Sequence, residues 1–149
     1  MHTHMNTNTN SGLVNVLATG NITHYPAVCA KATASFAVLS DTINTIRSVL
    51  GKDATPLKKQ IAALQKHEQQ KLNFTAALHL EKIREKNESV GGQNTDADET
   101  ADDRVVKLLR KGVLSLEQQI QATVESINEV LDELRCLLME SKEEEEEEQ

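Results

Sequence analysis

The stretch RVVKLLRKGVLSLEQQIQATVESINEVLDELRCLLME, residues 104–140, decides the fold class of this 149-residue chain. Ten positions in this stretch follow one another at alternating intervals of three and four residues, which places them on one face of a helix. Nine of the ten are apolar and the exception is Thr123. The ten positions are Val106, Leu109, Val113, Leu116, Ile120, Thr123, Ile127, Val130, Leu134 and Leu137. We predict one helix here, roughly 55–60 Å long at ~1.5 Å per residue.

A second apolar row lies beside this seam and consists of Val124, Leu131 and Leu138. The two rows together make a face wide enough to contact two partners. We take the second row as a candidate partner-binding face, for a protein partner or a second copy of the chain.

Two more helices precede it. The first is predicted over residues 26–50, because Pro26 suits a helix start and Gly51 is expected to end the helix in a left-handed conformation. Its seam keeps the same spacing and comprises Cys29, Ala32, Phe36, Leu39, Ile43, Ile46 and Leu50. The second is predicted over residues 55–86, with Thr55 as its cap. Its apolar stripe shifts phase in the middle, which indicates either contact with more than one neighbour or a local skip in the repeat.

These patterns predict an all-α fold in which three long amphipathic helices form an antiparallel, coiled-coil-like bundle over residues 24–140. The alternative is an extended coiled coil that completes its core with a partner. Helix 104–140 exceeds helix 26–50 by about 20 Å, so its surplus must find another partner, self-associate, or pack on helix 55–86 alone.

The remaining segments carry no sustained periodicity. Residues 1–23 are rich in Asn and Thr, and we expect disorder there, with a short apolar docking patch from Leu13 to Leu17. Residues 87–103 are expected to form a flexible acidic loop. Residues 141–149 include six consecutive Glu, Glu143–Glu148, and are expected to be a disordered tail.

Composition excludes several classes of protein. No run approaches the ~20 apolar residues of a membrane span. Aromatic residues make up 2% and the formal net charge is −7, which disfavours a base-stacking platform or a phosphate-backbone binder. The first ten residues lack the pattern of a signal peptide, and two cysteines make no disulfide framework. We expect a nuclear or cytosolic, reducing location rather than secretion.

Two charge features remain open to more than one interpretation. Seven cations flank the acidic loop, and as an antiparallel pair their helices would gather them at one end; they are Lys82, Arg84, Lys86, Arg104, Lys107, Arg110 and Lys111. They either neutralise the loop or form a candidate anion-docking cluster. The Glu tail either solubilises the chain or binds basic partners. We do not expect direct binding of nucleic acid.

No motif predicts catalysis, a metal site or a cofactor. His67-Glu68 resembles a zinc-protease helix, but position i+4 is Lys71, which would repel a metal. The acidic residues at 96–103 lack the Gly and Glu of a calcium loop. Cys29 lies on a helix seam and Cys136 has no predicted histidine neighbour, so neither is a convincing nucleophile. We predict that the chain is not an enzyme.

Three stretches resemble the "required for excision" B-type DNA repair family of small helical eukaryotic proteins, over roughly residues 24–140. They are Tyr25-Pro26 with Thr33 and Phe36; Leu64 to Leu72, continuing through Thr75 to Leu78; and Ile127 to Arg135, with Leu137 and Leu138 beyond. The resemblance implies a role in excision repair of damaged DNA and no catalytic residues. Members of that family carry another helix ahead of the Tyr-Pro segment, and the Asn- and Thr-rich residues 1–23 do not match it.

We therefore expect a non-catalytic accessory or scaffold protein that acts through protein–protein contacts. The alternative is a coiled-coil subunit of a cytoplasmic tethering or cytoskeletal complex.

Overall fold

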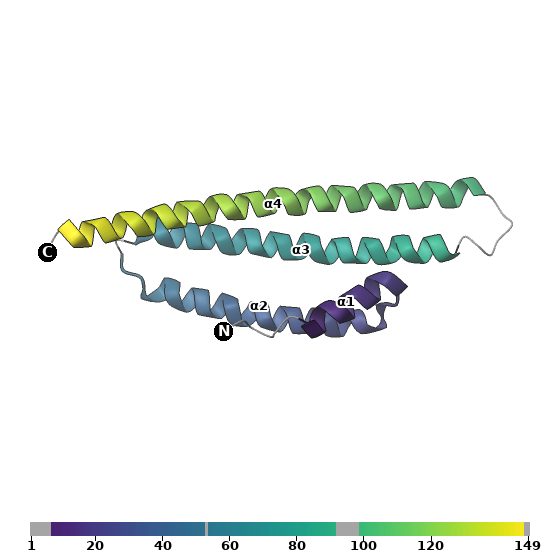
Figure 1. Ribbon diagram of the computed structural model, residues 1–149, viewed down its shortest axis with the longest axis horizontal. Helices are drawn as coiled ribbons and strands as arrows, with labels where there is room; N and C mark the ends of the chain where they lie inside the picture. The colour runs from purple at the N-terminus through teal and green to yellow at the C-terminus, as the bar shows by residue number, and fades with distance from the viewer. Residues whose placement is uncertain (1–6, 53, 92–98, 148–149) are drawn as a thin grey trace.

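The computed structural model describes residues 7–52, 54–91 and 99–147, and within these ranges the chain is helical, without a strand (Figure 1). The elements are α1 (Thr7–Thr19), a short 3-10 helix (Ile22–His24), α2 (Tyr25–Val49), α3 (Thr55–Gly91) and α4 (Glu99–Glu147). The all-α prediction is confirmed. The predicted three-helix bundle differs from the observed arrangement in two ways, which concern α2 and α1.

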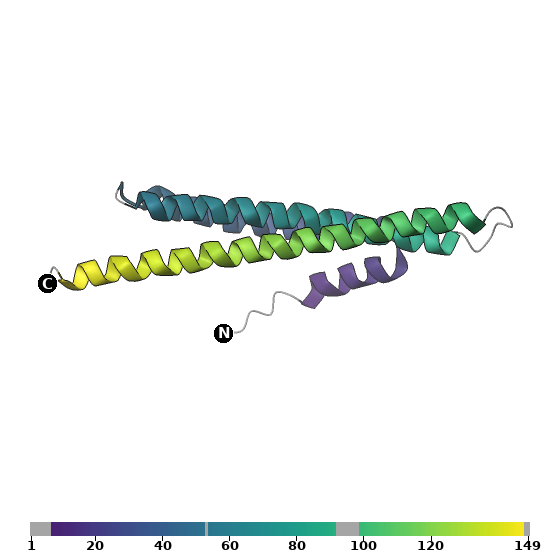
Figure 2. The same ribbon diagram turned by 90° about the horizontal axis from the view of Figure 1, so that it is seen from above.

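The main body is an antiparallel pair of α3 and α4, which run side by side in Figures 1 and 2. The antiparallel order follows from the cross-links, since Gln60 contacts Glu133 and Lys82 contacts Glu117. All ten predicted seam positions of α4 are buried or half-buried. Thr123 fits this seam because its hydroxyl donates to the Gln119 carbonyl at 2.7 Å, so no polar group is left unsatisfied. The part of α4 that exceeds α2 in length packs on α3, which is one of the three possibilities given above.

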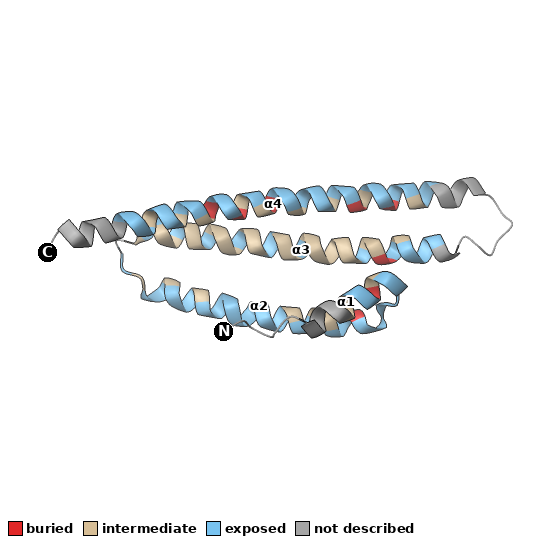
Figure 3. Ribbon diagram, viewed as in Figure 1, coloured by how far each residue is buried: buried red, intermediate tan, exposed pale blue. Residues whose placement is uncertain are grey.

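The second helix, α2, runs along the side of α3 that is opposite α4 and does not complete a common core with it (Figure 1). Its seam is covered only in part: Phe36 is 41% exposed, Leu39 58% and Ile46 50%. In contrast, α3 is half-buried around much of its surface (Figure 3). The predicted contact of helix 55–86 with more than one neighbour is therefore confirmed.

An N-terminal helix occupies residues for which we expected disorder. α1 packs on both α2 and α3, and Val16 is the most deeply buried hydrophobic residue of the described chain, at 2% exposed. Leu13 and Leu17 lie against the same cluster, with Tyr25 and Ile83. The physical reason is tertiary: Asn and Thr are poor helix formers, but one apolar face packed on a neighbour outweighs that preference.

The helix ends also differ from expectation. α2 ends in an extended residue, Leu50, and the left-handed glycine among the described residues is Gly20, not Gly51. The Thr55 hydroxyl donates to the Lys52 carbonyl, while Ala54 accepts the first helical bond from Lys58. Thr55 is therefore inside α3 and does not cap it.

The segments expected to be irregular are shorter than predicted. α3 continues to Gly91 and α4 begins at Glu99, so only residues 92–98 of the predicted loop lie outside the described residues. The α4 backbone continues through Glu147, where we expected a disordered tail. Glu is a good helix former, and extending an existing helix avoids the cost of nucleation, which outweighs repulsion of a few tenths of a kcal/mol per like-charged pair.

Candidate protein-interaction site

Tyr25 fixes the beginning of α2 against α3. Its hydroxyl donates to the Ala76 carbonyl at 3.4 Å and lies 3.4 Å from Nδ1 of His79, and the two rings meet edge to face at 6.0 Å. Burial raises the pKa of Tyr25 to about 12, aided by its hydrogen bond to Cys29. Burial also lowers the pKa of His79, and the nearby positive charge of Lys82 lowers it further. Burial where α2 packs on α3 is the largest cause of both shifts, which indicates a structural joint.

The other end of α2 is held by amide and guanidinium groups. The Arg47 guanidinium donates to Oε1 of Gln65 at 3.4 Å, and Nε2 of Gln65 donates to Oδ1 of Asn44 at 3.3 Å. These contacts join α2 to α3 about five to six turns away from Tyr25. α2 is thus attached to α3 near both ends by different chemistry.

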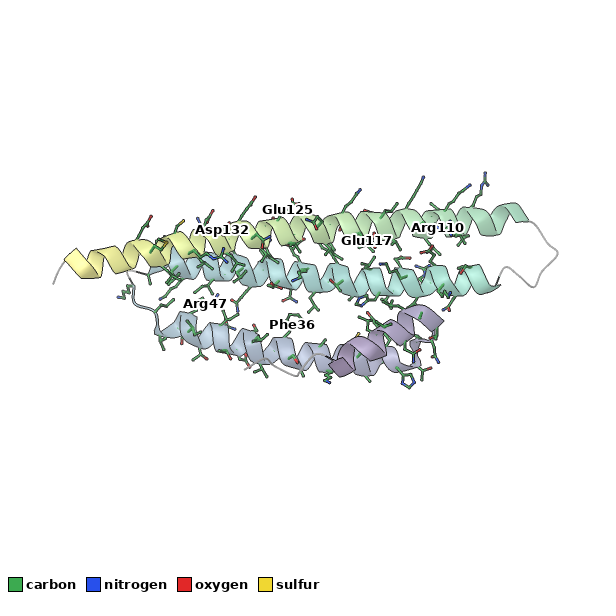
Figure 4. All side chains as sticks on the ribbon, in the orientation of Figure 1. Phe36, Arg47, Arg110, Glu117, Glu125 and Asp132 are labelled. Carbon is green, nitrogen blue, oxygen red and sulfur yellow. The ribbon has the colours of Figure 1, made fainter. Side chains whose placement is uncertain are left out.

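A groove of about 510 Å³ lies between these two attachments, and we call it the α2–α3 groove. Its principal walls are Phe36, Leu39 and Ile43 from α2, and Leu64, Glu68 and Leu72 from α3. Figure 4 labels Phe36 and Arg47 on α2, which mark the groove and its polar end. The lining is mainly apolar; its polar members include Gln65 and Gln69, and the carboxylate of Glu68 pairs with Lys71 at 3.5 Å. Such a surface can hold apolar side chains of another protein.

The predicted partner-binding row on α4 is partly used inside the molecule. Val124 and Leu131 are half-buried, and Leu138 is exposed. Whether this row binds a partner stays a prediction.

The predicted cation cluster is brought together at one end of the α3–α4 pair, as expected from antiparallel pairing. Several members already contact carboxylates: Lys82 pairs with Glu117 at 2.9 Å, and Arg110 pairs with Glu85 at 2.9 Å. Arg84 also pairs with Glu81, one turn away. These contacts reduce the charge that the cluster offers to an anion, and its docking role stays a prediction.

Groups suited to other chemistry are dispersed in the described part of the chain. No set of three or more His, Cys, Asp or Glu side chains gathers there in a way that could hold a metal ion. Cys29 is half-buried beside Tyr25, and Cys136 is exposed on α4. None of the described helices combines the length and apolar character that crossing a lipid bilayer requires.

Sequence reasoning identified the α2 seam but assigned it wholly to the internal bundle, so it missed the α2–α3 groove. One signal could have revealed an uncovered helix. α2 carries only three charged residues in 25, Lys31, Asp41 and Arg47, which is few for a helix with a solvated face.

Comparison with known protein families gives a match to a DNA repair family. The sequence pattern of a family described as DNA repair REX1-B matches residues 3–82, a stretch of 80 residues and more than half of the 149-residue chain. This stretch contains α1, α2 and both walls of the α2–α3 groove. The third resembling stretch, which begins at Ile127, lies outside it. No curated protein and no solved structure matches the chain.

Proposed function

The chain belongs to the DNA repair REX1-B family, and from this premise we propose that it is a non-catalytic accessory protein of excision repair that acts through protein–protein contacts. The family name indicates involvement in DNA repair. The accessory role and the contacts are our proposal. A nuclear or cytosolic location follows from it.

One observation carries the proposal: the uncovered apolar face of α2 lies within the residues that match the family. An exposed, contiguous apolar surface on a folded protein is typical of a protein-contact site. The face is also held in place, because Tyr25 and Arg47 attach α2 to α3 on either side of it. A rigidly held apolar face loses little entropy on binding, which favours recognition.

The test compares two leucine-to-glutamate variants in cells from which the endogenous protein has been removed. Leu39 and Leu114 are both 58% exposed, but Leu39 lies on the α2 face and Leu114 on α4, beyond the matched residues. We expect Leu39→Glu to reduce survival after DNA damage and to lose copurifying repair factors. Leu114→Glu should behave like the wild type, because it adds the same charge at the same exposure elsewhere.

Two outcomes would contradict the proposal. Wild-type chain that copurifies only with vesicle or microtubule proteins would favour the tethering or cytoskeletal alternative, for which the long α3–α4 pair is the supporting feature. Equal survival with Leu39→Glu and the wild type would show that the α2 face is not the contact surface in repair.

A further inference from the structure

The uncovered part of the α2 seam has the spacing of a helix that packs on another helix. Phe36, Leu39, Ile43 and Ile46 follow one another at intervals of three, four and three residues. This alternation matches the contact positions of coiled coils. Three of the four are exposed and Ile43 is half-buried. The missing neighbour is therefore a helix rather than a loop or a small molecule.

The volume of the α2–α3 groove sets how much of that helix enters. An engineered apolar cavity of ~150 Å³ holds one benzene ring, so a groove of about 510 Å³ has room for about three side chains of that size. Three consecutive seam residues of a partner helix would fill it. The residues Phe36, Leu39 and Ile43 of a second copy make such a set.

Antiparallel pairing makes the seam complementary to itself. It places Phe36 opposite Ile46 of the second copy, and Leu39 opposite Ile43, with every contact made twice. Each α2 would then lie against the α2–α3 groove of the other copy, so that two copies of α2 and two of α3 surround one core.

Charge favours a second copy over a foreign helix. Charged residues that flank a helical seam select its partner, but the flanking positions up to Thr42 are hydroxyls, namely Thr33, Ser35, Ser40 and Thr42. The next flanking residue is Arg47, whose guanidinium already donates to Gln65 of the same chain. Asp41 is the single charged residue between Phe36 and Ile46. Asp41 lies on the side of α2 away from the seam, so in an antiparallel pair it faces no charged residue of the second copy.

We infer that the chain forms a two-fold symmetric dimer in which α2 of each copy lies antiparallel in the α2–α3 groove of the other. The inference rests on one part of the proposed function, that the α2 face makes protein contacts. It names the protein that covers this face.

The experiment measures the mass of the purified full-length chain by sedimentation and by light scattering during size-exclusion chromatography. We expect twice the chain mass of 16.5 kDa. Leu39→Glu should raise the dissociation constant of the dimer at least about 100-fold, because each dimer would then bury two unpaired carboxylates. Val38→Glu is the matched control, since Val38 is the adjacent residue, is exposed, and lies off the seam and outside the groove lining.

Mixed cysteine variants test the orientation, with Cys29 and Cys136 replaced by Ser. Under a mild oxidant, Phe36→Cys chains should cross-link to Ile46→Cys chains and not to one another. Self-linked Phe36→Cys chains would indicate parallel pairing and overturn the inference.

The remaining outcomes are also decisive. A single-chain mass at all concentrations up to about 100 μM, or a dimer unaffected by Leu39→Glu, would overturn the inference. Circular dichroism checks that the variants stay helical, and Ile46→Ser replaces Leu39→Glu if the latter does not. If the wild type is a monomer but Leu39→Glu still loses repair factors, the dimer is overturned and the proposed function is supported. If the wild type is a dimer but captures no repair factor, the dimer is supported and the proposed function is contradicted.

Discussion

Replacing Gly20 with alanine should weaken the attachment of α1 to α3. Gly20 ends α1 with a φ of 70°, and its amide donates to the Val16 carbonyl at 2.9 Å. A Cβ at this position would collide with the side-chain oxygen of Asn87 and lie 3.4 Å from Cγ of Lys86. The change therefore adds backbone strain at a point where α1 and α3 approach closely.

The magnitude follows mainly from the backbone. A left-handed conformation costs a residue with a Cβ about 1–2 kcal/mol. The colliding oxygen of Asn87 is at the end of a side chain that can rotate, so the collision adds little to this cost. For a chain of this length, 1 kcal/mol shifts the melting temperature by ~2–4 °C. We expect Gly20→Ala to lower the melting temperature by about 2–8 °C.

The assay is thermal unfolding followed by circular dichroism, with Gly51→Ala as the matched control. Gly51 lacks a positive φ and has no atom within 4 Å of an added Cβ, so alanine there should be neutral or slightly stabilising. Combining Gly20→Ala with Asn87→Ala should retain most of the loss, because the backbone strain persists. A Gly20→Ala variant as stable as Gly51→Ala, or full recovery in the double variant, would refute the reasoning.

Three further predictions concern α4, α3 and the cation cluster. Gly112→Ala should raise the free energy of unfolding by about 1 kcal/mol, since Gly112 lies inside α4 with open space around it; an unchanged urea midpoint would contradict this. The lowered pKa of His79 should make stability fall as pH drops below 6.5, the value in the unfolded chain, because the unfolded state then binds the proton more readily. His79→Gln should flatten this dependence of the free energy of unfolding on pH, and a dependence that persists unchanged in His79→Gln would contradict the reasoning. Replacing four residues of the cation cluster with alanine should not change how much of the chain a DNA column retains at low salt. Salt-dependent retention of the wild type that these changes abolish would show direct DNA binding. The four residues are Arg104, Lys107, Arg110 and Lys111.

The parts of the fold that were predictable are those in which local periodicity and tertiary burial agree. The seam of α4 is regular over ten positions, and α3 buries that face. The existence of this helix therefore followed from spacing alone. The antiparallel pairing was predicted from long helices joined by one short and one long connection.

The parts that were not predictable depend on which neighbour covers a face. Residues 7–19 have weak intrinsic preference for helix, and only the packing of Val16 against Tyr25 and Ile83 explains the helix there. The α2 seam has the same regular spacing as that of α4, yet spacing does not say whether its partner lies in the same chain. The groove was missed for that reason, since a heptad is equally consistent with an internal and an external neighbour.

The location of the family match gives a physical reason for dividing the molecule into two sides. The matched residues end at position 82, within α3, so the family pattern covers α1, α2 and most of α3 and excludes α4. Yet α4 provides the most extensive packing that α3 has. A chain cut at residue 82 would leave the α4-facing side of α3 uncovered, and a long isolated helix with an open apolar stripe is marginal in water. We therefore interpret α4 as the support that keeps α3 straight and buried on one side. That support lets α3 hold α2 at Tyr25 and at Arg47 while the groove between them stays open.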